Sequence, residues 1–258
     1  MSDLRRLGAR AAPLVAALIA ALMAAPGAGA ADEPDRYKNC VLLVTVRPAE
    51  AMESALAWAD AGGGVPARHC IALALQALGD YRAAARGFHR LAVELDHAPA
   101  EIGAKLYAQA GNAWLRANQP KTARVAFDQA LKLTPEDPDL LIDRALAYAD
   151  IKDYRAAIED LDAAIRHAPE RADVWVLRAT AYRRLGEGDQ AGADIAEALA
   201  RDPANADGLV ERGLLNLEAG EAAAARRDFA EVLVLAPDSP AAELARDYLD
   251  QLDKAEPP

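Results

Sequence analysis

The chain has 258 residues, a formal net charge of −11 and few aromatic residues, which make up 5% of the sequence. Alanine supplies much of the apolar content, and this composition favours closely packed helices over a sheet of β-branched side chains. A body this acidic repels phosphate backbones, so we expect no nucleic-acid partner.

Residues 1–30 have the features of a cleavable signal peptide. The start is basic, residues 11–25 form an uncharged apolar run, and residues 28–30 are the small residues that a signal peptidase requires. The apolar run is shorter than the roughly 20 residues that span a bilayer. We therefore expect export to the periplasm and no membrane span in the mature chain; an uncleaved membrane anchor is the alternative.

Residues 31–65 are predicted to form an N-terminal helical segment. The stretch from Pro48 to Trp58 has the pattern of a lone second helix of a hairpin, and the glycines at 62–64 end it. No strand pattern precedes this glycine run and no Lys-Ser or Lys-Thr pair follows it. We therefore interpret the run as a loop and not as a phosphate-binding site.

The only two cysteines are Cys40 and Cys70. An even number of cysteines in an exported chain predicts a disulfide, here between the N-terminal segment and the helices that follow it. Two buried free thiols are the alternative. The four histidines are scattered and no catalytic or nucleotide-binding motif occurs. We therefore expect no metal, no cofactor, no catalytic residues and no enzyme activity.

Four blocks of 34 residues repeat without gaps over residues 104–239. In each block the eighth residue is Gly or Ala, the twenty-fourth is a large apolar residue, and a proline closes the block. The blocks are 104–137, 138–171, 172–205 and 206–239. Each has one apolar stripe early and one late at helical spacing, with a turn between them. This pattern predicts helical hairpins that bury their stripes against their neighbours.

These columns resemble the tetratricopeptide-repeat (TPR) family, which residues 153–169 match almost throughout. The resemblance implies an all-α, right-handed superhelical solenoid of about five hairpins. A degenerate repeat occupies residues 66–103, and its five extra residues are expected to lengthen a helix or the link near 97–103. Residues 240–258 are predicted to form an amphipathic capping helix and a tail, because repeat stacks need a polar end.

A polar pair of columns also repeats with the 34-residue period. Arginine stands at the seventh position and aspartate at the twenty-third in the last three blocks, and the first block lacks both. The pairs are Arg144 with Asp160, Arg178 with Asp194, and Arg212 with Asp228. Their joint presence and absence predicts structural ion pairs between the helices of a hairpin. Acid–base dyads are disfavoured, because a catalytic site does not normally repeat with its scaffold.

In TPR proteins the first helix of each hairpin lines a concave groove, and the resemblance implies a binding surface for a protein or peptide there. The fifth, ninth and twelfth residues of each block form a stripe distinct from the core. The predicted partner-binding residues are Asn112, Leu115, Arg116, Ile142, Leu146, Val176, Thr180, Arg183, Val210, Leu214 and Leu217. The alternative is that adjacent first helices bury this stripe inside the stack.

The sequence as a whole predicts a periplasmic, non-catalytic scaffold that binds a protein or peptide partner in a cell-envelope complex. Two other functions stay open. One is an accessory or regulatory subunit of an envelope enzyme, and the other is a structural protein that assembles through its end helices. The sequence does not indicate an oligomeric state.

Overall fold

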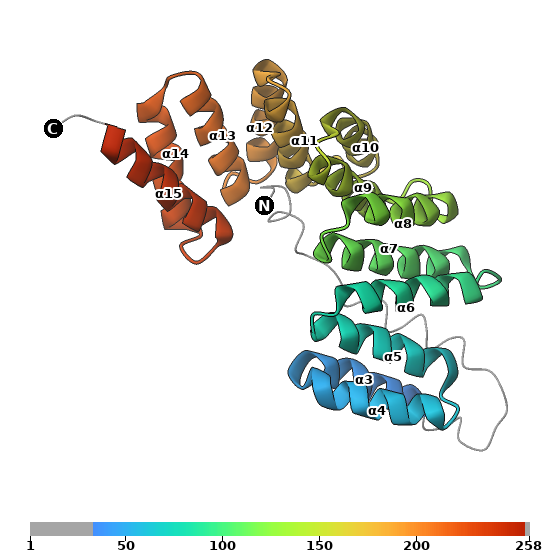
Figure 1. Cartoon of the computed structure of the whole chain (residues 1–258). Helices are drawn as coiled ribbons and strands as arrows, with labels where there is room; N and C mark the ends of the chain where they lie inside the picture. The colour runs from blue at the N-terminus through green and yellow to red at the C-terminus, as the bar shows by residue number, and fades with distance from the viewer. Residues whose placement is uncertain (1–32, 256–258) are drawn as a thin grey trace. The chain divides into compact units, whose positions relative to one another are not determined.

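The computed structural model describes residues 33–255 of the chain, and all regular secondary structure in this range is helical. The helices, in chain order (Figure 1), are α3 (Glu33–Val46), α4 (Pro48–Asp60), α5 (Gly64–Ala77), α6 (Tyr81–Glu94), α7 (Ala100–Arg116), α8 (Pro120–Leu133), α9 (Pro138–Asp150), α10 (Tyr154–His167), α11 (Ala172–Arg184), α12 (Gly188–Arg201), α13 (Ala206–Glu218), α14 (Ala222–Leu235) and α15 (Pro240–Ala255). The predicted signal peptide, residues 1–30, lies outside the described range. Within that range no helix combines the length and hydrophobicity that a membrane crossing requires.

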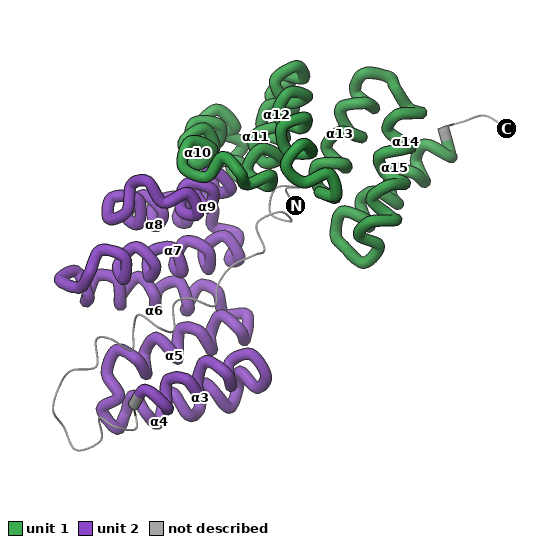
Figure 2. The backbone as a smooth tube through the Cα atoms, turned by 180° about the vertical axis from the view of Figure 1, so that it is seen from behind, with its two compact units in different colours: residues 1–10, 148–258 green, residues 11–147 purple. Residues whose placement is uncertain are grey.

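The chain divides into two compact units, which are described separately (Figure 2). Within the described range, unit 2 comprises residues 33–147 and unit 1 comprises residues 148–255. The boundary at residue 148 falls inside α9. Both units consist of consecutive antiparallel helix pairs, so the all-α repeat solenoid predicted from the 34-residue period is confirmed.

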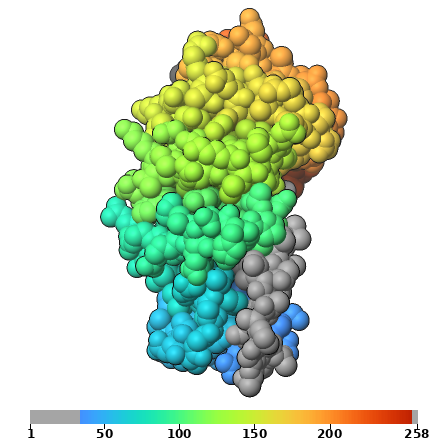
Figure 3. Space-filling model, turned by 90° about the vertical axis from the view of Figure 1, so that its right-hand side faces the viewer, coloured from blue at the N-terminus to red at the C-terminus, as the bar shows by residue number. Residues whose placement is uncertain are grey.

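In unit 2 successive helices form layers that follow one another along the stack, as the blue-to-green bands of Figure 3 show. The core between α6 and α7 contains the fully buried Phe88 and Leu106 with alanines at the crossing points. Helix α7 has 17 residues, whereas α9 has 13. The extra residues of the degenerate repeat therefore lengthen its neighbouring first helix at its N-terminus, one of the two predicted outcomes.

The N-terminal segment differs from the prediction of a lone second helix at Pro48 to Trp58. That helix is α4, and α3 packs against it and against α5 as its partner. The described residues thus contain one hairpin more than expected. Helix α3 was missed because its apolar residues include the exposed Leu42 and Val46 and lack the small residues of the repeat columns. Tyr37 and Cys40 make its buried face.

In unit 1 the two hairpins α11–α12 and α13–α14 are followed by α15, which is the predicted capping helix. Its apolar side chains Leu244, Tyr248, Leu249 and Leu252 pack on the core around Phe229. The rings of Phe229 and Tyr248 stack with centroids 5.3 Å apart. The last hairpin therefore has its apolar face covered by a helix whose other side is polar, as a repeat stack requires.

The side chains at the eighth and twenty-fourth positions of the repeat complement each other in size. A Cβ atom on Gly111 would lie 2.5 Å from the ring of Phe127, and one on Gly213 would lie 2.5 Å from the ring of Phe229. Both rings are fully buried. Where the eighth residue is alanine, the twenty-fourth is the smaller Leu161 or Ile195. Glycine thus makes room for a phenylalanine ring between the two helices of a hairpin.

The turn inside each regular hairpin passes through a residue in the left-handed conformation at the fifteenth position. This residue is Asn118 at φ 57°, Lys152 at 64°, Gly186 at 77° and Gly220 at 79°. Glycine adopts such angles without strain, whereas a lysine side chain meets its own backbone. The turn geometry is therefore kept even where the residue does not favour it.

Candidate protein-binding surface

The predicted groove stripe lies on the first helices, and most of it is buried in the stack. Ile142 and Leu146 in unit 2 are each 6% exposed. In unit 1 Val176 and Thr180 have exposures of 1% and 0%, and Val210 is also buried. Side chains with no accessible surface cannot contact a partner, so the packing alternative describes these positions. The buried set also contains Leu115, Arg183 and Leu214, whereas Asn112 and Leu217 are partly exposed and Arg116 is exposed.

The buried polar members of this stripe in unit 1 are satisfied within the protein. The Thr180 hydroxyl donates to the carbonyl oxygen of Val176 at 2.9 Å. The Arg183 guanidinium donates to both carboxylate oxygens of Glu211 at 2.6 and 3.1 Å and to Glu218 at 2.9 Å. Burial opposes the charge on Arg183, but the hydrogen bonds and charges of the two glutamates outweigh it and raise its pKa. Arg183 therefore links α11 to α13.

The two polar members in unit 2 also have partners. Asn112 Nδ2 on α7 donates to Asp143 Oδ2 on α9 at 2.8 Å. Arg116 donates to the Tyr81 hydroxyl at 2.7 Å, and its guanidinium carbon lies 4.3 Å from the centroid of that ring. Arg116 keeps an exposed surface despite these contacts. Of the stripe residues in unit 2, Arg116 is therefore the most accessible.

Two of the predicted arginine–aspartate pairs are present in unit 1. Arg178 donates from Nε and Nη2 to the two oxygens of Asp194 at 2.8 and 2.7 Å. Arg212 donates to Asp228 at 2.6 and 3.0 Å. The pKa of Arg178 is raised above its ordinary value, mainly because of its hydrogen bonds to Asp194. The pairs Arg178–Asp194 and Arg212–Asp228 therefore each link the two helices of one hairpin.

Sequence reasoning missed a second aspartate column that joins neighbouring repeats. In unit 1 Arg178 also donates to Asp162 of the preceding repeat at 2.6 Å. In unit 2 Arg144 donates to Asp128, again of the preceding repeat, at 2.9 Å. The available signal was that each aspartate precedes its arginine by 16 residues. Arg144 and Asp160 fall in different units, and their pairing stays a prediction.

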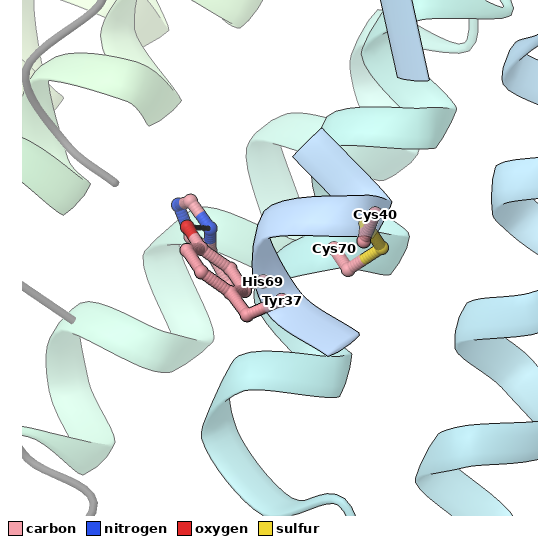
Figure 4. Close-up of a disulfide and its surroundings, with 4 residues drawn as sticks. All are labelled: Tyr37, Cys40, His69 and Cys70. Atoms are coloured by element: carbon pink, nitrogen blue, oxygen red, sulfur yellow. Dashed lines mark hydrogen bonds between the residues drawn. A yellow bond between two sulfur atoms is a disulfide. The ribbon is translucent and has the colours of Figure 1, made fainter. Parts of the chain in front are cut away.

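The predicted disulfide is present and joins α3 to α5 (Figure 4). The Cα atoms of Cys40 and Cys70 are 6.2 Å apart, and both side chains are buried. This bond closes a loop across the α3–α4 hairpin. The bond thereby fixes the N-terminal helix to the repeat that follows it, beside the packing of Tyr37 on Trp58 and Ala67.

Beside the disulfide, a buried histidine connects three helices of unit 2 (Figure 4). His69 Nδ1 lies 2.8 Å from the Tyr37 hydroxyl, and its Nε2 lies 3.0 Å from Gln109 Oε1. Because Gln109 Oε1 only accepts, we assign the ring proton to Nε2 and the Tyr37 proton to the bond with Nδ1. Burial lowers the pKa of His69 to about 4, against a smaller opposite effect of the Gln109 bond, and burial raises the pKa of Tyr37 to about 12. Both groups are therefore neutral structural links.

Comparison with known proteins agrees with this architecture. Sequence profiles of the tetratricopeptide repeat match residues 110–182 and 176–240. A tetratricopeptide repeat protein from Parabacteroides merdae ATCC 43184 has a TM-score of 0.60 at 18% identity, over 84% of this chain and 84% of that chain. The thermophilic TPR protein TTC0263 from Thermus thermophilus has a TM-score of 0.57 at 22% identity, over 73% and 98%. YrrB, described as a TPR protein with an unusual peptide-binding site, has a TM-score of 0.53 at 18% identity, over 74% and 96%.

The TM-scores establish a shared fold with these structures, and identities below 25% extend the likeness no further than the fold. The two profile matches together cover residues 110–240. Proteins built from such repeats are typically non-catalytic scaffolds that bind protein or peptide partners. The repeat columns, the hairpins and the capping helix all agree with these matches. The chain therefore belongs to the tetratricopeptide-repeat family.

Proposed function

We propose that this protein is an exported, periplasmic scaffold that binds a protein or peptide partner within a cell-envelope complex and performs no chemistry itself. Three observations support the proposal. The repeats are of a kind that binds other proteins. Residues 1–30 have the pattern of a signal peptide. A disulfide joins the only two cysteines.

The disulfide is the observation that carries the proposed location. Disulfides persist in oxidising compartments such as the periplasm and are rare in the reducing cytosol. Cys40 and Cys70 are the only members of their type in the chain, and both are buried at the contact of α3 and α5. The N-terminal hairpin thus contains a bond that an exported chain can keep.

For the partner surface we propose the part of the first-helix face that the stack leaves accessible. In unit 2 this part includes Arg116, and in unit 1 it includes the partly exposed Leu217. Arg116 offers a charge and an aromatic contact through Tyr81, whereas Leu217 offers an apolar contact. The buried members of the predicted groove pack between the helices that carry this face.

Export and binding are tested separately. The intact mass of protein recovered by osmotic shock should correspond to a chain that begins near Ala31 and carries no free thiol. A species that keeps Met1 and stays in the cytosolic fraction would contradict the proposed location.

For binding, a photo-crosslinking residue placed at Arg116 or at Leu217 should give a discrete adduct in intact cells. The matched control is the same residue at Val234, which is 79% exposed on the second helix α14. Equal labelling at Val234, or no adduct at either test position, would rule out this face.

A further inference from the structure

A second surface lies on the second helices of unit 2, away from the first-helix face. A cavity of about 300 Å³ opens between α6 and α8. Helix α6 lines it with Arg86, His89 and Arg90, and α7 contributes Trp114. The α8 wall includes Val125, whose side chain is 47% exposed. A cavity of this size accommodates one large side chain and the groups beside it.

The charge around this cavity is opposite to that of the whole protein. Arg86 and Arg90 are exposed, stand one turn apart on α6, and make no hydrogen bond or ion pair among the described residues. The acidic residues of α6 and α8 are Glu94 and Asp128. Glu94 is bonded to Arg68 at 2.7 Å, and Asp128 is bonded to two other arginines. The cavity therefore presents two uncompensated positive charges in a chain of net charge −11.

The repeat period does not account for these arginines. They occupy the twenty-second and twenty-sixth columns, counted from Phe88 as the twenty-fourth. The equivalent pairs in the four regular repeats are Val125 and Gln129, Glu159 and Ala163, Ala193 and Glu197, and Arg227 and Glu231. Only the degenerate repeat has two arginines there. Two like charges one turn apart repel each other locally, and the repeat pattern does not require them at these columns.

We propose that this cavity binds an acidic segment of a partner protein. One aromatic or large aliphatic side chain of the segment enters between Trp114 and Val125, and carboxylates on either side pair with Arg86 and Arg90. A nucleic acid fits less well, because its phosphates would extend over the acidic remainder of the chain. This site is independent of the first-helix face and of the cellular location.

The test uses the purified mature chain and a fluorescein-labelled peptide of sequence Glu-Glu-Phe-Glu-Glu, read by fluorescence polarisation. Arg86→Glu combined with Arg90→Glu should weaken binding at least about tenfold, since both attractive contacts become repulsive. The matched control combines Arg166→Glu with Arg227→Glu, two exposed arginines on second helices of unit 1. The control changes the net charge equally and should bind like the unaltered chain.

A peptide with alanine in place of phenylalanine should bind at least about tenfold more weakly, because the cavity then stays empty. If the glutamate variant loses its helical circular dichroism, Arg86→Gln with Arg90→Gln takes its place. Equal weakening in the control variant, equal binding of the alanine peptide, or no detectable binding overturns the proposal. Arginine-dependent binding of a single-stranded oligothymidine without binding of the peptide also overturns it.

Discussion

The ion pair between Arg178 and Asp194 joins the two helices of the hairpin α11–α12, and its removal should destabilise unit 1. The Arg178 side chain is 16% exposed and the Asp194 side chain is 6% exposed. Asp194→Ala removes two charge-assisted hydrogen bonds and leaves the Nε and Nη2 donors of Arg178 with little access to water. Losing one partner of a fully buried pair costs about 3–5 kcal/mol.

The expected cost for Asp194→Ala is smaller, because Arg178 retains Asp162 at 2.6 Å. We expect a loss of about 2–3 kcal/mol in the free energy of unfolding. Asp162→Ala should cost at most about 1 kcal/mol, since that carboxylate is 38% exposed and water replaces it. Asp194→Ala should cost more than Asp162→Ala, because Asp194 is the more buried carboxylate and accepts two hydrogen bonds from Arg178 against one for Asp162.

A double-mutant cycle isolates the interaction. Urea unfolding followed by circular dichroism should show that Asp194→Ala with Arg178→Ala is less destabilised than the sum of the single variants, by about 1–2 kcal/mol. The midpoint and the slope of each curve are compared, because repeat stacks can unfold in more than one step. Strict additivity, or a loss below about 0.5 kcal/mol for Asp194→Ala, would show that the pair does not stabilise the hairpin.

Three further predictions concern unit 2 and the predicted groove. Reduction of Cys40–Cys70 should lower the unfolding free energy by about 3 kcal/mol, measured with and without dithiothreitol, whereas a chain lacking both cysteines should not respond. The folded pKa of His69, about 4, lies below its ordinary 6.5, so the unfolded state takes up the proton first. The contribution of neutral His69 to the free energy of unfolding is therefore complete above about pH 6.5 and declines by about 3 kcal/mol toward pH 4. A His69→Gln variant should show a urea midpoint that changes less with pH between these values. Leu146→Ser with Leu214→Ser should lower the melting temperature by several degrees, because both side chains are buried. An unchanged melting curve would show that these leucines are not part of the core and would favour the predicted binding role.

Periodicity in the sequence predicted the parts of the fold that depend on repetition. The hairpins of residues 104–239 and the apolar face of α15 follow from the spacing of apolar, small and proline residues, and the extra residues near 97–103 predicted a longer helix or a longer link. The arginine–aspartate columns were also predictable, because two residues that share presence and absence across repeats tend to touch. Each of these inferences compares several copies of the same unit within one chain.

Features without a second copy, or with two equivalent outcomes, were not predictable. An apolar stripe at positions such as Val176 and Val210 has the same sequence pattern whether a partner or the next helix covers it. Helix α3 has no repeat column to align. The cavity beside Arg86 and Arg90 requires two helices from different repeats, and only their packing brings these residues to Trp114.

The left-handed turn residue also affects the local stability of the repeats. The turn between α9 and α10 places Lys152 at a φ of 64°, which costs about 1 kcal/mol that glycine would not incur. The corresponding turns at Gly186 and Gly220 carry no such cost. The turn at Lys152 is therefore the one of these three whose backbone strain is relieved when it opens locally.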